Sequence, residues 1–158
     1  MKSQARYARK LNRKRVLICL LVFFALLPVF SYLHEAGHAL VCIADGNEAE
    51  ISVDIFNGGI TLCHGDVSNL FAYKISGGLL AGIVGTTIGI GLFRWKIPFI
   101  AITTIGIGHL VNAGIETFAD SYFTHGGEWG LVMGFVEFVT FFSLLLIFDR
   151  KTVSRGMK

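Results

Sequence analysis

The sequence predicts an all-helical membrane protein with about four transmembrane helices and a short β-hairpin after the first. Its 158 residues are 53% hydrophobic and only 16% charged, and the mean hydropathy is +0.63. This composition is far from that of a soluble domain. Since one membrane helix needs about 20 apolar residues, the chain has room for about four crossings and little else. We therefore expect a single membrane-embedded core over residues 16–149.

Basic residues are concentrated at the two ends of the chain. They crowd residues 1–15 and 150–158, whereas the core between them holds only Lys74, Arg94 and Lys96. Lys and Arg next to apolar segments favour the cytoplasmic side and contact anionic lipid, so we interpret them as topology signals and not as nucleic-acid contacts. Four crossings then predict that both termini lie in the cytoplasm.

The first apolar segment and the residues after it have distinct patterns. Residues 16–44 form a longer helix than a bilayer requires, and Pro28 predicts a bend because proline removes a helix hydrogen bond. Residues 48–66 alternate in polarity around Asn57 and Gly58, which is typical of a β-hairpin.

Three further helices are expected, at residues 72–93, 98–118 and 130–148. The first of these carries four glycines at spacings of four, three and four, which places them on one helical face. Such a face allows close backbone packing against another membrane helix. The glycines are Gly78, Gly82, Gly85 and Gly89.

The cysteines argue against a disulfide framework. Cys19, Cys42 and Cys63 make an odd count, and the first two fall in the first predicted helix. The cysteines therefore do not predict a redox compartment.

The strongest chemical signal is a pair of histidines four residues apart on the first predicted helix. His34 and His38 share one helical face, so both imidazoles can reach one metal ion. Glu35 lies beside them, where it can take a proton from a metal-bound water molecule. By chance such a pattern arises in roughly one comparable chain in a hundred, and ionisable residues inside a membrane usually mark function. The alternative is a polar helix end at the interface.

The third predicted helix supplies candidates for a further ligand. His109, Asn112 and Glu116 follow one another at three and four residues, and Asp120 lies one turn further. A catalytic zinc site usually has three protein ligands and one open position. We expect some of these side chains to face the bundle interior, where the first helix presents its histidines.

A family resemblance joins these features. Four features follow in order along the chain. They are a His-Glu-x-x-His helix that continues with Ala39-Leu40, a glycine-bearing hairpin, the glycine-rich stretch 76–82, and Asn112 eight residues before Asp120. Over residues 26–120 the sequence resembles the site-2 protease family of intramembrane zinc metalloproteases.

The resemblance implies that His34, His38 and Asp120 bind zinc, with Glu35 as the general base and Asn112 near the substrate carbonyl. Its implied substrates are transmembrane or membrane-associated proteins. Asp120 is followed by Ser121 and Tyr122 where the family has two glycines, so Glu116 and His125 follow it as candidates for the third ligand, ahead of His109. The family's site more commonly opens to the cytoplasm, whereas the charge pattern directs His34 towards the outer leaflet.

Two other functions stay open. The chain can be a non-catalytic subunit, either of a larger membrane protein complex or of a homo-oligomer. It can instead be a metal-handling membrane protein, with soft-metal ligands drawn from Cys63, His64, His109 and His125. No pattern indicates a nucleotide or nucleic-acid site.

Overall fold

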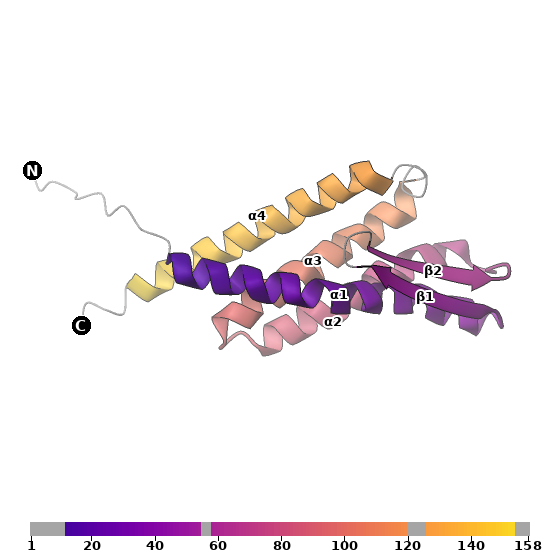
Figure 1. The fold of residues 1–158 in the computed structure, drawn as a ribbon, viewed down its shortest axis with the longest axis horizontal. Coiled ribbons are helices and arrows are strands. Elements are labelled where there is room, and N and C mark those ends of the chain that lie inside the picture. The colour runs from indigo at the N-terminus through magenta and orange to yellow at the C-terminus, as the bar shows by residue number, and fades with distance from the viewer. Residues whose placement is uncertain (1–11, 55–57, 120–125, 154–158) are drawn as a thin grey trace, which may run out of the picture.

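The computed structural model describes residues 12–54, 58–119 and 126–153, which form four helices and one antiparallel two-stranded sheet (Figure 1). The predicted helices and hairpin are confirmed, and all four helices are long and apolar enough to cross a membrane. The elements are α1 (Arg13–Ala44), β1 (Glu48–Asp54), β2 (Gly58–His64), α2 (Leu70–Gly91), α3 (Lys96–Phe118) and α4 (Gly126–Val153).

Some predicted features lie outside the described residues. They are the turn residue Asn57, the candidate ligands Asp120 and His125, and most of the two basic terminal segments.

Helix α1 is the longest element. Its 32 residues correspond to about 48 Å, more than the hydrocarbon thickness of a bilayer. The Asn12 side chain caps its first turn by accepting a hydrogen bond from the Arg15 amide, and the helix continues through Pro28. Gly46, with a φ of 84°, lets the chain turn sharply after the helix towards the hairpin.

The chain crosses the bundle four times. The start of α1, the α2–α3 link and the end of α4 lie at one end of the molecule, and the hairpin lies at the other (Figure 1). Both strands of the hairpin pack against the C-terminal half of α1.

The hairpin presents different residues on its two faces. Ile51 and Val53 are half-buried and face inward, together with Thr61, which pairs with Ile51. Ile60 and Leu62 on β2 point outward and are exposed.

A disulfide joins the end of α1 to β2, and here the expectation drawn from the cysteine count is wrong. Cys42 and Cys63 are bonded, and Cys19 is a buried free thiol. Cys42 lies one turn after His38, at the point where α1 meets the hairpin. Cys42 is therefore surrounded by protein and not by lipid. The interpretation of residues 16–44 as one membrane helix did not predict this.

Side-chain hydrogen bonds reinforce the same junction. The Ser68 amide and hydroxyl both donate to the Asp45 carboxylate, at 2.8 and 2.6 Å, and these bonds hold the pKa of Asp45 below its usual value. The Asn47 side chain donates to the Asp66 carbonyl oxygen at 2.8 Å. The two segments at the base of the hairpin, residues 45–47 and 66–68, are thus joined by polar contacts, and the disulfide joins β2 to α1.

Glycines bring α2 and α3 into backbone contact, as the spacing predicted. A Cβ on Gly85 would lie 2.8 Å from the Gly106 Cα, and one on Gly78 would lie 2.6 Å from the His109 carbonyl oxygen. These distances are too short for a methyl group, so the approach of α3 to α2 depends on the missing side chains.

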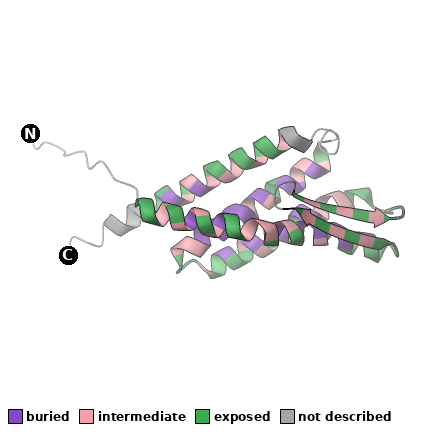
Figure 2. Cartoon of the chain, viewed as in Figure 1, coloured by how far each residue is buried: buried purple, intermediate pink, exposed green. Residues whose placement is uncertain are grey.

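Burial is distributed as expected for a bundle in lipid. Buried positions gather where α1, α2 and α3 meet, and exposed positions follow the outer faces of α1 and α4 (Figure 2). The exposed side chains on those faces include Phe24, Leu131 and Phe135. Polar residues that are buried in such a setting therefore call for a specific explanation.

Candidate metal centre

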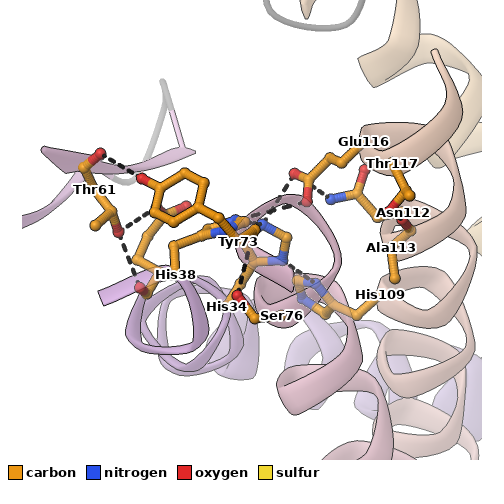
Figure 3. A network of polar contacts seen from close by, with 11 residues as sticks. His34, His38, Thr61, Tyr73, Ser76, His109, Asn112, Ala113, Glu116 and Thr117 are labelled. Atoms are coloured by element: carbon orange, nitrogen blue, oxygen red, sulfur yellow. Dashed lines mark hydrogen bonds and ion pairs between the residues drawn. The ribbon is translucent and has the colours of Figure 1, made fainter. Parts of the chain in front are cut away.

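A polar pocket of about 400 Å³ lies between α1, β2, α2 and α3. Six of the residues to which the sequence assigned chemistry line this pocket, and Figure 3 shows five of them, His34, His38, His109, Asn112 and Glu116. The lining residues are Ser31, His34, Glu35, His38, Gly58, Gly59, Ile60, Thr61, Tyr73, His109, Asn112 and Glu116.

Three buried side chains converge inside this pocket. The Nε2 atoms of His34 and His38 are 3.1 Å apart, and Glu116 places one carboxylate oxygen 3.0 Å from His34 Nε2 and the other 3.6 Å from His38 Nε2. Zinc holds such donors at about 2.0–2.1 Å, so two ligands of a tetrahedral ion are about 3.3 Å apart. The three donors therefore have the spacing and the chemical identity of a metal-ligand set, and the cluster could hold a metal ion.

The orientation of His38 is set by a backbone contact. Its Nδ1 lies 2.7 Å from the Tyr73 carbonyl oxygen, which can only accept a hydrogen bond. Nδ1 must therefore carry the proton, and a neutral His38 turns the lone pair of Nε2 towards His34 and Glu116. A histidine ligand whose second nitrogen donates to a carbonyl is a common arrangement in metal sites.

The other two members also have partners behind them. His34 Nδ1 lies 3.2 Å from His109 Nδ1, which leaves His34 Nε2 facing the pocket. The Asn112 amide donates to Glu116 Oε1 at 3.0 Å. Asn112, about one turn before Glu116 on α3, and His109, about two turns before it, thus orient the cluster without belonging to it.

The pocket carries more negative charge than its depth in the bundle would favour. Glu35 and Glu116 are 7% and 3% exposed, and no Lys or Arg is among the described residues that line the pocket. Two carboxylates buried between helices that are apolar enough to cross a membrane are costly unless they are compensated. A divalent cation would offset both charges.

Strand β2 holds Glu35 at the edge of the cluster. The Thr61 hydroxyl lies 2.8 Å from Glu35 Oε2 and 2.9 Å from the Glu35 carbonyl oxygen. The strand passes directly over this side chain, as the space at Gly59 shows. A Cβ on Gly59 would lie 2.7 Å from Glu35 Oε1. The carboxylate is therefore fixed in the pocket wall, beside the three converging donors.

Gly77 of α2 faces the point where the two histidine nitrogens meet. A Cβ at this position would lie 2.8 Å from His34 Nε2 and closer still to His38 Nε2, and its nearest neighbours are these imidazoles and no backbone atom. We expect Gly77→Ala to fold but to lose metal binding, because the methyl group would displace the donors. Metal content of the purified protein measures the effect.

Gly91→Ala is the matched control for this substitution. It adds the same methyl group to the same helix, with nothing within 4 Å of the new Cβ, and should leave metal content unchanged. Full metal occupancy in a folded Gly77→Ala variant would contradict the geometry described above.

The structure brings together most of the site residues named from the sequence. His34, Glu35 and His38 share the pocket with Asn112, while Asp120, the expected third ligand, lies outside the described residues. Glu116, ranked behind it, is the carboxylate that meets the histidines.

Two residues in the site were not anticipated. Thr61 and Tyr73 reach the pocket only because the hairpin and α2 fold back onto α1. The one available signal was the inward alternation of β2, which places Thr61 on the same face as Cys63.

No model of a protein family matches this chain, and no curated protein or solved structure is similar enough to it to indicate a relationship.

Proposed function

We propose that the protein is a zinc-dependent endopeptidase that acts on membrane-associated proteins. The observation that carries the proposal is the convergence of His34 Nε2, His38 Nε2 and the Glu116 carboxylate within 3.0–3.6 Å, with the separate carboxylate of Glu35 fixed beside them. A structural metal site needs ligands only. A hydrolytic site needs an additional base next to an accessible space, and the pocket of about 400 Å³ provides that space.

His34, His38 and Glu116 would hold the ion. Two imidazoles and one carboxylate leave a fourth position open, which is the ligand number of catalytic zinc sites. When bound, zinc would supply Lewis acidity that polarises a peptide carbonyl and lowers the pKa of a water molecule towards neutrality.

Glu35 would act as the general base and then as the general acid. Its carboxylate takes the proton of the attacking water and passes it to the nitrogen of the leaving amine, so that the peptide C–N bond breaks with no net change in the protein. The Thr61 hydroxyl, 2.8 Å from Glu35 Oε2, restrains the carboxylate in the position this transfer requires.

Asn112 would contribute to substrate binding. One hydrogen of its amide nitrogen is directed to Glu116 Oε1, and the second can donate to a substrate carbonyl in the pocket. This assignment keeps the role expected from the sequence and adds the orientation of Glu116.

The hairpin is the proposed docking surface for the scissile segment. Residues 58–61 of β2 form one wall of the pocket, and in the described part of the chain the sheet has only two strands, so each strand keeps one edge without a strand partner. An extended peptide could pair with such an edge and present its carbonyl to the site. His34, Glu35, His38 and Asn112 are also among the residues on which the resemblance to the site-2 protease family rests, whereas Glu116 takes the place of Asp120 as the proposed third ligand.

The structure does not favour the metal-handling alternative in the form expected. Cys63 is bonded to Cys42 and has no thiolate to offer, and His64 lies on the exposed part of the hairpin, 3.8 Å from Glu50. A non-catalytic subunit would keep the fold and need no turnover, and the following experiment separates it from a peptidase.

Removal of the metal should abolish hydrolysis reversibly. We expect the purified, detergent-solubilised protein to cleave fluorescently labelled casein, an unfolded chain that can bind in extended form. Treatment with 1,10-phenanthroline should stop the cleavage, and added zinc should restore it. Absence of cleavage by the zinc-loaded protein would favour the non-catalytic subunit, and cleavage that persists without metal would contradict the proposed chemistry.

A further inference from the structure

The metal-ligand cluster lies much nearer to one end of α1 than to the other. From Arg13 to His34 the helix rises about 31 Å, whereas from His38 to its last residue, Ala44, it rises about 9 Å. The first distance is close to the full hydrocarbon thickness of a bilayer. The pocket therefore belongs to the membrane face on which the hairpin lies, and not to the face on which α1 begins.

The basic residues mark the opposite face. Arg13, Lys14 and Arg15 open α1, and Arg94 and Lys96 flank the α2–α3 link, which lies at the same end of the bundle (Figure 1). Only Lys74 among the core's basic residues lies on the hairpin side. By the bias of Lys and Arg towards the cytoplasm, the hairpin lies on the non-cytoplasmic side.

The disulfide is an independent observation that leads to the same side. Cys42 and Cys63 join α1 to the hairpin beside the pocket, one turn after His38 and two residues after Thr61. Disulfides persist in oxidising compartments and are rare in the cytosol, where thiols are kept reduced. Charge segregation and cysteine pairing depend on different residues and different physics, and both favour a hairpin on the non-cytoplasmic side.

We propose that the pocket opens on the non-cytoplasmic face of the membrane and takes extended segments that membrane-anchored proteins present at that face. The choice of substrate rests on the peptidase function proposed above, whereas the orientation does not. A segment arriving from the cytoplasm would have to carry unpaired backbone groups through most of the hydrocarbon layer to reach His34, which lipid strongly disfavours. A segment at the hairpin face has a short path along β2.

Cysteine labelling in intact cells tests the orientation. In a Cys19→Ala background that retains the disulfide, Ser52→Cys places a thiol on the exposed outer face of β1, and Trp95→Cys places one in the exposed α2–α3 link. A membrane-impermeant maleimide should label the Ser52→Cys variant before lysis and the Trp95→Cys variant only after lysis. A Ser52→Cys protein that reacts only after lysis overturns the proposal. If the Ser52→Cys protein does not accumulate in cells, Glu50→Cys, which is exposed on the same face of β1, takes its place in the experiment.

Thiol counting tests the compartment argument. The wild-type protein, denatured without reductant, should show one reactive thiol, that of Cys19, and reduction should release the other two. Three thiols without reduction, in protein taken from the membrane under alkylating conditions, would contradict an oxidising environment around the hairpin.

The substrate class is tested with two single-span proteins that carry the same unstructured casein segment on opposite sides of the membrane. Only the protein with the segment on the non-cytoplasmic side should be cut, and cutting of the other one overturns the inference. If labelling places the hairpin outside but neither protein is cut, the peptidase proposal and with it the substrate class fail, while the orientation stands.

Discussion

A Glu35→Gln variant should retain its metal and lose hydrolysis. The substitution keeps the size of the side chain and one oxygen near Thr61, but an amide cannot accept the proton of the attacking water. General acid–base catalysis contributes roughly 10²–10⁴-fold to such reactions, and kcat for casein cleavage should fall by that factor. Zinc content should be unchanged, because Glu35 lies outside the group of three converging donors. Wild-type turnover in the variant would remove Glu35 from the mechanism.

Substitutions of Thr61 test the same mechanism with a smaller expected loss of activity. Thr61→Val removes the hydroxyl with little change in shape, so kcat should fall by roughly 10–100-fold, the scale of one hydrogen bond to a charged group, with KM and zinc content little changed. Thr61→Ser keeps the hydroxyl and should recover most of the activity. Equal activity of the Val and Ser variants would show that the contact is only structural.

A Glu116→Gln variant should lose both the metal and the activity. The carboxylate approaches His34 Nε2 to 3.0 Å and His38 Nε2 to 3.6 Å and is the one anionic member of the cluster. Changes to groups behind a metal ligand already weaken binding by about 10–100-fold, and loss of a direct anionic ligand should weaken it further. Zinc content and casein cleavage are the two measurements.

Glu137→Gln is the matched control. This carboxyl lies on α4, against Gly108 of α3, and lines a separate apolar pocket with Phe24 and Phe138. The same replacement of a carboxyl by an amide, made inside the bundle but away from the cluster, should leave zinc content unaltered. An equal loss of zinc in both variants would indicate a general effect of this replacement on the bundle.

The fold was largely predictable because its determinants are local. Apolar segments of spanning length, alternation around the turn at residue 58, and the glycine face of residues 78–89 each specify one element or one contact. The pairing of His34 with His38 is equally local, since it follows from helical periodicity.

The third ligand was not predictable in the same way. The identity of the third ligand depends on the axial position of α3 relative to α1 and α2. This position is set by contacts such as those of Gly78 with the His109 carbonyl and of Gly85 with Gly106. A shift by one turn would exchange Glu116 for a neighbour four residues away. The family resemblance ranked Asp120 first, whereas packing brings Glu116 to the histidines.

The disulfide was missed for a related reason. Hydropathy treats residues 16–44 as one membrane segment, so Cys42 seemed to lie in lipid, whereas the hairpin folds back and covers that end of α1. The alternation of β2 turns Cys63 inward towards it. The periodicities of the two elements, taken together, could have indicated the pair.

The most direct test of the metal site is zinc content measured side by side in the wild-type protein and in the Glu116→Gln and Asp120→Asn variants. We expect about one zinc ion per chain in the wild type and in Asp120→Asn, and almost none in Glu116→Gln. Full zinc in Glu116→Gln together with its loss in Asp120→Asn would contradict the ligand set, and a wild-type protein that binds no zinc would contradict the metal centre itself.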